Sequence, residues 1–182
     1  MEIIKLKLEG TFEIRPKMHG DMRGYFAETY REKIFAEHGL QTEWLQENQS
    51  LSTKKGTIRG LHYQKPPVAQ TKLVKTPVGK ILDVFVDIRK NSSTYGEWDS
   101  IVLSEELCNA VYVPRGFAHG FCTLTENVIV QYKVDNYYSP EDENGIIWND
   151  KDLNIDWNTE NPKLSERDLT LQNFKDLISP FD

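Results

Sequence analysis

The stretch of sequence that decides the fold runs from residue 72 to residue 88 and reads KLVKTPVGKILDVFVDI. Apolar residues recur at every second position on both sides of a Pro-Val-Gly turn. This is the spacing at which the side chains of a β-strand share one face. The pattern predicts two strands joined as a β-hairpin. The segment 128–134 alternates in the same way and predicts one core-facing side made of Val128, Val130, Tyr132 and Val134.

Shorter strand patterns occupy much of the remaining chain. They are expected at Ile3–Leu8, Phe12–Arg15, Gly24–Tyr30, Glu43–Ser50, Thr57–Gln64, Trp98–Leu103, Ala110–Val113 and Ala118–Leu124. Many short strands separated by Gly, Pro, Asn and Ser indicate a sandwich or a barrel. Helices are predicted only at Arg31–His38, closed by Gly39, and at Ser165–Leu177, begun by a serine cap. The Asn-, Asp- and Pro-rich tail from residue 140 is expected to cover the barrel, so residues 1–182 form one domain.

Composition narrows the class of protein. The chain has 182 residues, of which 38% are hydrophobic and 27% charged, values that argue against a disordered protein. Its apolar runs fall far short of the ~20 residues that a transmembrane helix needs, and no export signal pattern precedes them, which predicts a cytoplasmic protein. With 28 acidic and 22 basic residues the net charge is −6. This balance argues against nucleic acids and anionic membranes as partners.

One strand pattern carries a cation and an imidazole. Arg59 and His62 lie three positions apart, so strict alternation sends them to opposite faces, unless a bulge at Gly60 brings them together. From this segment alone, a surface arginine beside a buried histidine is as good an interpretation as a functional pair.

A second motif, PxGxxH at Pro114–His119, matches half of the cupin signature. A metal-binding cupin also needs a His-x-His pair, but the corresponding residues are His62, Tyr63 and Gln64. Two histidines without an acidic partner leave a zinc or iron site short of its usual three protein ligands. We therefore predict no metal.

Several ordered blocks carry a more specific resemblance that covers nearly the whole chain. They are Asp21–Glu28, Gln46–Asn48, Ile58–Gln64, Ala69–Val74, Val86–Arg89, Gly116–Phe121 and Leu164–Asp168. In these blocks the sequence resembles the dTDP-4-dehydrorhamnose 3,5-epimerase family. The resemblance implies an all-β cupin jelly-roll barrel with a few short peripheral helices, a homodimer, and no cofactor. It implies a dTDP-4-keto-6-deoxy sugar as substrate, inverted at C3 and C5 on the route to dTDP-L-rhamnose.

Epimerisation beside a ketone needs a base, a group that stabilises an enolate, and a proton donor on the opposite face. By resemblance these are His62 backed by Asp168, then Lys72, then Tyr132. Residue chemistry alone leaves alternatives open. Asp168 could be a solvated carboxylate, Lys72 could face outward from an edge strand, and Tyr132 could be an ordinary core residue.

The resemblance also implies a set of substrate-binding residues. These are Arg23, Phe26, Glu28, Gln46, Glu47, Asn48, Arg59, His119, Tyr138, Glu143 and Arg167. Arginines suit the two phosphates of a nucleotide sugar, and aromatic rings suit its base. Two other functions remain open: an epimerase acting at one centre or on another nucleotide sugar, and a non-catalytic cupin that binds sugar nucleotides. A metal-dependent cupin oxygenase is disfavoured by the missing metal ligands.

Overall fold

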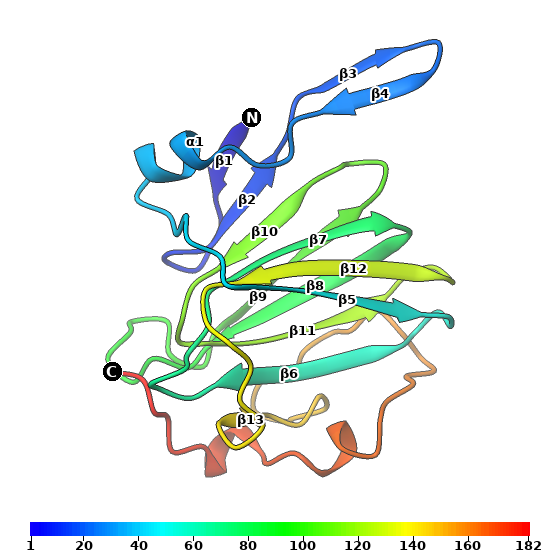
Figure 1. The fold of residues 1–182 in the computed structure, drawn as a ribbon. Coiled ribbons are helices and arrows are strands. Elements are labelled where there is room, and N and C mark those ends of the chain that lie inside the picture. The colour runs from blue at the N-terminus through cyan, green and yellow to red at the C-terminus, as the bar shows by residue number, and fades with distance from the viewer.

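The computed structural model describes residues 1–182 and is built mainly of two antiparallel β-sheets (Figure 1). The six-stranded sheet has the order β1 (Glu2–Lys5), β2 (Phe12–Arg15), β10 (Ala110–Val113), β7 (Lys72–Val78), β12 (Val128–Val134) and β5 (Gln46–Ser52). The five-stranded sheet has the order β13 (Glu143–Gly145), β6 (Ile58–Gln64), β11 (Phe117–Thr123), β8 (Lys80–Asp87) and β9 (Trp98–Ser104). The two sheets confirm the predicted all-β fold.

A separate two-stranded hairpin, β3 (Met18–Asp21) and β4 (Gly24–Ala27), projects away from both sheets (Figure 1). The sequence patterns did not predict β3 or the short strand β13. Met22, at the tip of the hairpin, is fully exposed, and the Phe26 side chain is 72% exposed. Large apolar side chains left in water at the end of an arm indicate a surface that contacts another molecule.

The interior between the two sheets is filled by side chains from both. Val74, Val111 and Val130 of the six-stranded sheet pack with Phe85 and Phe117 of the five-stranded sheet in one buried cluster. Val128 and Val130 are buried and Tyr132 packs against the same cluster, which confirms the face predicted from the alternation. Side chains that line the rest of this interior therefore face into a cup with apolar walls.

The prediction of a hairpin at residues 72–88 is wrong. Both strands form, but β7 pairs with β10 and β12, whereas β8 pairs with β9 and β11 in the other sheet. The chain crosses between the sheets at Gly79, whose φ is +80°. A Cβ there would lie 2.7 Å from Thr125 Oγ1, so the position requires glycine. Alternation identifies a strand but does not choose its neighbour, because pairing partners are distant in sequence.

One of the two predicted helices forms. Helix α1 (Glu32–Glu37) ends before Gly39, whose φ of +68° fits the expected glycine cap. The helix predicted at Ser165–Leu177 is replaced by two 3-10 turns, η1 (Asp168–Thr170) and η2 (Phe174–Asp176). Between them Gln172 accepts a hydrogen bond from the backbone of Ile147, so the chain is extended there. No helix of the structure has the length and apolar character of a membrane span.

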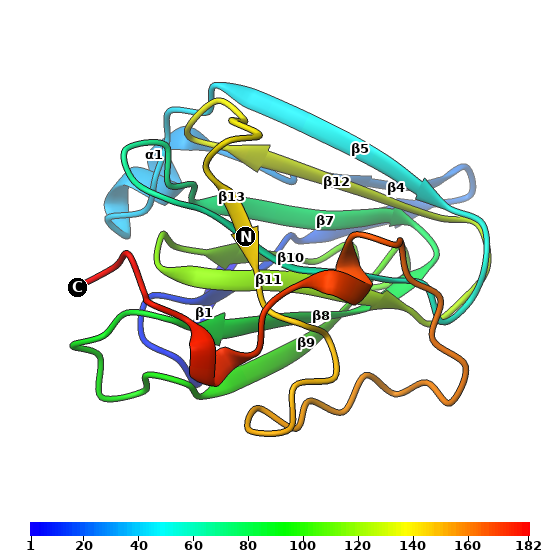
Figure 2. The same cartoon turned by 90° about the horizontal axis from the view of Figure 1, so that it is seen from below.

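The C-terminal segment lies across the outer face of the five-stranded sheet, where it is drawn orange to red in Figure 2. Ile146, Leu153, Trp157 and Leu177 from this segment are buried against Val84 and other residues of the sheet. The tail therefore covers the barrel, as predicted, and it brings residues 165–168 to the edge of β6.

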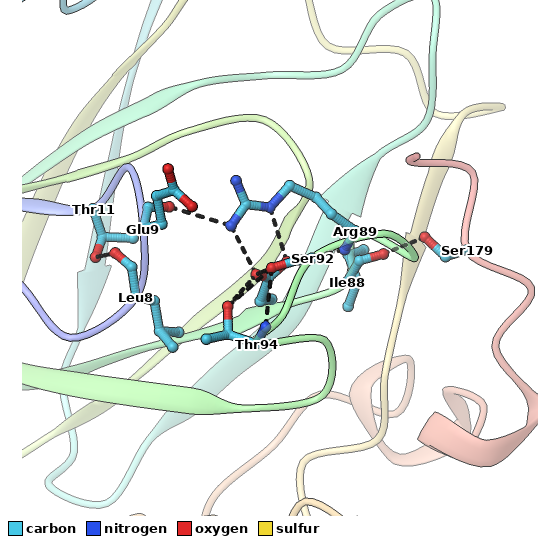
Figure 3. Close-up of polar contacts among 9 residues, drawn as sticks. Leu8, Glu9, Thr11, Ile88, Arg89, Ser92, Thr94 and Ser179 are labelled. Atoms are coloured by element: carbon cyan, nitrogen blue, oxygen red, sulfur yellow. Dashed lines mark hydrogen bonds and ion pairs between the residues drawn. The ribbon is translucent and has the colours of Figure 1, made fainter.

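One end of the barrel is held by a buried carboxylate, Asp87. Its partners Arg89, Ser92 and Thr94 are labelled in Figure 3. Its oxygens accept hydrogen bonds from Arg89 Nε at 2.9 Å and Arg89 Nη2 at 2.7 Å, and from the hydroxyls of Ser92 and Thr94 at 2.6 and 2.7 Å. Arg89 Nη2 also donates to the carbonyl oxygen of Glu9 at 3.2 Å. Asp87 thus links β8, the following loop and the N-terminal loop.

Substitution Asp87→Asn is expected to lower the free energy of unfolding by about 2 kcal/mol, because charge-assisted hydrogen bonds to a buried group are lost. Burial by itself would raise the pKa of Asp87, but the hydrogen bonds from Arg89, Ser92 and Thr94 together lower it. This stabilisation is complete above the ordinary carboxyl pKa and is lost as pH falls through the lower folded-state pKa. Urea denaturation measures the free energy of unfolding of the wild type and of Asp87→Asn. Asp182→Asn removes a carboxylate that is 86% exposed and paired with Lys90, and should leave stability unchanged.

Candidate active site

A bulge in β6 places Arg59 and His62 on the same face. On the partner strand β11, His119 lies opposite His62 and Phe121 opposite Arg59, so three steps along β6 match two along β11. The bulge occurs at Gly60, where φ is +109° and a Cβ would lie 2.6 Å from the carbonyl oxygen of His119. Glycine is therefore required, and the two polar side chains both line the interior of the cup.

Two cavities of about 340 and 290 Å³ lie between the sheets and share His62, Lys72, Tyr132 and Arg167 in their walls. The first also contains Gln46, Asn48, Gln64, Gln70, Tyr138 and Glu143, and the second also contains Ser50, Arg59, His119, Ser165 and Asp168. Because the four shared residues stand where the cavities adjoin, any molecule that spans both must pass them.

His62 forms a close pair with Asp168. Its Nε2 lies 2.6 Å from Asp168 Oδ1, and the Asp168 side chain is only 5% exposed. Burial would raise the pKa of Asp168, but the hydrogen bond and charge of His62 outweigh it and lower the pKa. An ionised Asp168 accepts a hydrogen bond from Nε2–H, which leaves Nδ1 of a neutral imidazole free as a base. Nδ1 lies 4.0 Å from Glu143 Oε1.

Lys72 reaches this pair from the opposite sheet. It lies on β7, and its Nζ is 3.4 Å from the backbone carbonyl oxygen of His62. Burial lowers the pKa of Lys72 to about 8, although the negative charges of Asp83 and Glu143 act to raise it. Lys72 therefore faces inward, not outward from an edge strand, and places a cation beside His62.

Tyr132 also faces the cavities from the six-stranded sheet. It lies on β12, between β7 and the edge strand β5. Burial, together with the charge of Glu143, raises its pKa above the ordinary value near 10. Its phenol thus keeps a proton that it can donate. Because His62 and Tyr132 come from opposite sheets, a molecule between them presents opposite faces to the two side chains.

His119 belongs to a second imidazole–carboxylate pair. Its Nε2 lies 3.0 Å from both oxygens of Asp83, which has no exposed surface. The imidazole lines the second cavity while Asp83 lies behind it. The pairing fixes the orientation of His119 in the cavity wall.

The first cavity is bordered by a cluster around Glu143. Its Oε2 accepts a hydrogen bond from the Tyr138 hydroxyl at 2.6 Å and pairs with Arg167 Nη1 at 2.5 Å. On the facing strand β5, Gln46 Nε2 donates to Asn48 Oδ1 at 2.8 Å. Five of the predicted substrate-binding residues thus meet here.

Arg59 stands at the far end of the second cavity. Its Nε donates to Ser52 Oγ at 3.1 Å and its Nη2 to the carbonyl oxygen of Leu51 at 3.2 Å. The guanidinium is anchored at the end of β5 and retains further N–H donors for an anion.

Four predicted binding residues do not line the cavities of their own chain. Glu47 alternates with Gln46 and Asn48 along β5, so its side chain faces outward and pairs with Lys133 at 3.5 Å. It cannot contact a substrate held between the two sheets. Arg23, Phe26 and Glu28 belong to the projecting β3–β4 hairpin or follow it, where Arg23 pairs with Asp21 and Glu28 with Arg31.

The structure also shows site residues that sequence reasoning missed: Gln64 and Gln70 line the first cavity, and Asp83 lies behind His119. Asp83 carries a signal, because it is an acidic residue in the middle of the apolar run 81–86. Gln64 ends a quoted motif, and strand alternation puts it on the same face as His62. Nothing in the local pattern distinguishes Gln70.

The chain is similar to known proteins over nearly its whole length. The family model of dTDP-4-dehydrorhamnose 3,5-epimerase matches residues 5–176. The protein of that name from Shigella flexneri is 46% identical over 177 residues, which is 97% of each chain. The dTDP-6-deoxy-D-glucose-3,5-epimerase from Legionella pneumophila, solved in complex with dTDP-4-keto-L-rhamnose, is 39% identical with a TM-score of 0.91, over 97% of this chain and 94% of that chain.

A third similar structure is a 3′-monoepimerase from Streptomyces bikiniensis in complex with dTDP. It is 31% identical with a TM-score of 0.88, over 93% of this chain and 86% of that chain. That structure carries substitutions of a histidine and a tyrosine with the same separation along the chain as His62 and Tyr132. The sequence match over nearly the full length and the shared fold show that the chain belongs to the dTDP-4-dehydrorhamnose 3,5-epimerase family.

Proposed function

We propose that this chain inverts C3 and C5 of dTDP-4-dehydro-6-deoxy-D-glucose through enolate intermediates, which yields dTDP-4-dehydrorhamnose for dTDP-L-rhamnose synthesis. The observation that carries the proposal is the His62–Asp168 pair, with Nε2 and Oδ1 2.6 Å apart, facing Lys72 across the cup. A base beside a fixed cation is the combination that removal of a proton next to a ketone requires.

In the first step Nδ1 of His62 removes the proton from C3 or C5 of the sugar. The C4 ketone makes these protons acidic because it can accept the resulting charge. Asp168 holds the imidazole in the tautomer whose Nδ1 is free, and its negative charge stabilises the imidazolium. General-base catalysis of this kind contributes roughly 10²- to 10⁴-fold to a rate.

The enolate oxygen that develops at C4 needs donors that are already in place. Lys72 supplies a cation from β7, and its apolar strand neighbours Leu73 and Val74 are buried. His119, held by Asp83, lies on the wall of the adjoining cavity. Donors fixed in a site shielded from water stabilise such a charge more strongly than water does.

Inversion is completed when a proton returns to the opposite face of the same carbon. Tyr132 stands on the six-stranded sheet, opposite His62 on the five-stranded sheet, and its raised pKa keeps the phenol protonated. Tyr132 is therefore the proposed donor at C5. Its presence does not separate double from single epimerases, because a histidine and a tyrosine of the same spacing occur in the 3′-monoepimerase.

The nucleotide is proposed to lie along the second cavity, with its diphosphate near Arg59. Tyr138, Gln46 and Asn48 line the first cavity and offer polar groups to the hexose. The cup of one chain lacks the predicted contacts from Arg23, Phe26 and Glu28. We propose a homodimer in which the exposed β3–β4 hairpin of one chain reaches the cleft of the other.

The function is tested by NMR of dTDP-4-dehydro-6-deoxy-D-glucose with the protein in D₂O. The expected result is the dTDP-4-dehydrorhamnose product with solvent deuterium at both C3 and C5. Deuterium and inversion at C3 alone would show a single-centre epimerase, which the similarity to the 3′-monoepimerase keeps as the alternative. Binding of the nucleotide sugar without any exchange would instead show a non-catalytic binding protein.

The role of Tyr132 is tested by Tyr132→Phe, which removes only the phenol oxygen. We expect epimerisation at C5 to fall by about 10²-fold, the contribution of a positioned proton donor, with a smaller effect on deuterium exchange at C3. NMR in D₂O follows both carbons at once. Equal losses at C3 and C5 would contradict the assignment of Tyr132 as the C5 donor. Tyr95→Phe, on the loop before β9 and 38% exposed, is the control and should have no effect.

A further inference from the structure

The loop at residues 135–142 lies at the mouth of the first cavity and is fastened by three glutamines. Gln46 Oε1 accepts a hydrogen bond from the backbone N–H of Tyr138 at 3.0 Å, and Gln64 Oε1 accepts one from the N–H of Ser139 at 2.8 Å. Gln70 Nε2 donates to the carbonyl oxygen of Asn136 at 3.0 Å. Gln46 and Gln64 come from different sheets, so the loop bridges both walls of the cup.

Gln64 differs from the other two glutamines because half of its amide group is unused. Its side chain is 4% exposed and lines the first cavity, yet Nε2 has no hydrogen-bond partner in the chain. Exchanging the amide nitrogen and oxygen does not remove the problem, because the nitrogen would then face the N–H donor of Ser139. The orientation of the amide is thus fixed by the loop, and a buried donor remains.

A buried donor without an acceptor is uncommon and costs roughly 1–3 kcal/mol. Evolved sites retain such a group where a bound molecule supplies the acceptor. Gln64 follows His62 by two positions on the same face of β6, which separates their Cα atoms by roughly 7 Å. His62, Lys72 and Tyr132 line the same cavity.

We propose that Gln64 is a substrate-binding residue whose Nε2 donates a hydrogen bond to an oxygen of the hexose held between His62 and Tyr132. This inference rests on the proposed function. The neutral amide suits a neutral sugar oxygen, whereas the diphosphate is matched by the cation Arg59. Gln64 therefore has two roles. Its oxygen holds the loop at residues 135–142, and its nitrogen fixes the sugar relative to His62.

Two variants separate these tasks. Gln64→Glu keeps an acceptor for the Ser139 N–H but removes the amide donor, and Gln64→Met removes both groups at similar volume. Isothermal titration calorimetry compares dTDP with dTDP-L-rhamnose as probes. We expect both variants to weaken dTDP-L-rhamnose binding and to raise KM by about 10-fold or more, as for loss of a buried hydrogen bond. Binding of dTDP should remain unchanged.

Every other pattern overturns the inference. A loss in Gln64→Met alone would mean that only the loop contact matters, and a loss in Gln64→Glu alone would mean that the added charge acts. Equal weakening of dTDP and dTDP-L-rhamnose would place the donor on the nucleotide. Wild-type affinity and KM in both variants would show that Gln64 does not bind the sugar. Thermal denaturation verifies that each variant is folded.

The control is Gln131→Glu, which adds the same charge on the outer face of β12, where Gln131 Nε2 contacts Gln49. It should bind and turn over like the wild type.

Failure of the proposed function is distinguishable, because the wild-type protein itself would then show no epimerisation in the same assay. In that case calorimetry with dTDP-L-rhamnose still tests the contact of Gln64 with the sugar.

Discussion

Substitution His62→Asn is expected to lower kcat by about 10²-fold or more, because the base that removes the substrate proton is lost. Binding of dTDP is expected to be retained, since asparagine fits the space of the imidazole and the residues proposed to hold the nucleotide are unchanged. Steady-state kinetics and calorimetry measure the two effects. A variant with wild-type kcat would contradict the assignment of His62 as the base.

A double variant tests whether Asp168 acts through His62. Because Asp168 touches the imidazole at 2.6 Å and is buried behind it, the double variant His62→Asn, Asp168→Asn should be no slower than His62→Asn alone. If the double variant instead shows the product of the losses in kcat caused by the two single substitutions, Asp168 has its own contact with substrate. His38→Asn changes an exposed histidine at the end of α1 and should have no effect.

Substitution Lys72→Met is expected to lower kcat by about 10²- to 10³-fold, the loss that follows removal of one donor to a developing oxyanion. The matched control is Lys75→Met on the same strand. Lys75 is three positions along β7, so it lies on the outer face and does not line either cavity that contains His62. Comparable losses in both variants would contradict a role for the Lys72 ammonium in stabilising the enolate.

The pH profile gives a second test of Lys72. Burial lowers its pKa to about 8, so the ammonium is present below this pH and is lost as the pH rises through it. The rate should therefore fall on the alkaline side with an apparent pKa near 8. Tyr132 does not account for such a decline, because its pKa is raised. Lys72→Arg should abolish the alkaline decline in whatever activity remains, and a wild-type rate that is constant up to pH 10 would contradict the assignment.

The strands and their faces follow from local pattern, but their partners do not. Alternation at 128–134 predicted the inward face of β12 because the period of a strand is two residues. The same rule at 72–88 predicted a false hairpin, because it carries no information about whether β7 pairs with β8 or with distant strands. The C-terminal helix failed for a related reason. Gln172 is held extended by the backbone of Ile147, a contact that depends on the folded barrel.

The candidate site was predictable to the extent that family resemblance located its residues. The pairing of His62 with Asp168, 106 positions apart, and the inward direction of Lys72 are visible only in the folded chain. The bulge at Gly60 decides between the two interpretations of Arg59 and His62 that alternation left open. The second carboxylate, Asp83, and the unpartnered amide nitrogen of Gln64 had no local signal as strong as their burial.

The central claim is that the imidazole of His62 removes a proton from the carbon next to the sugar ketone. Its most direct test is the rate of solvent deuterium exchange at C3 and C5, measured by NMR for the wild type and for His62→Asn at saturating substrate. The account predicts that the wild type exchanges both positions and that the variant loses exchange at both by about 10²-fold or more. Exchange by the variant at the wild-type rate would contradict the account.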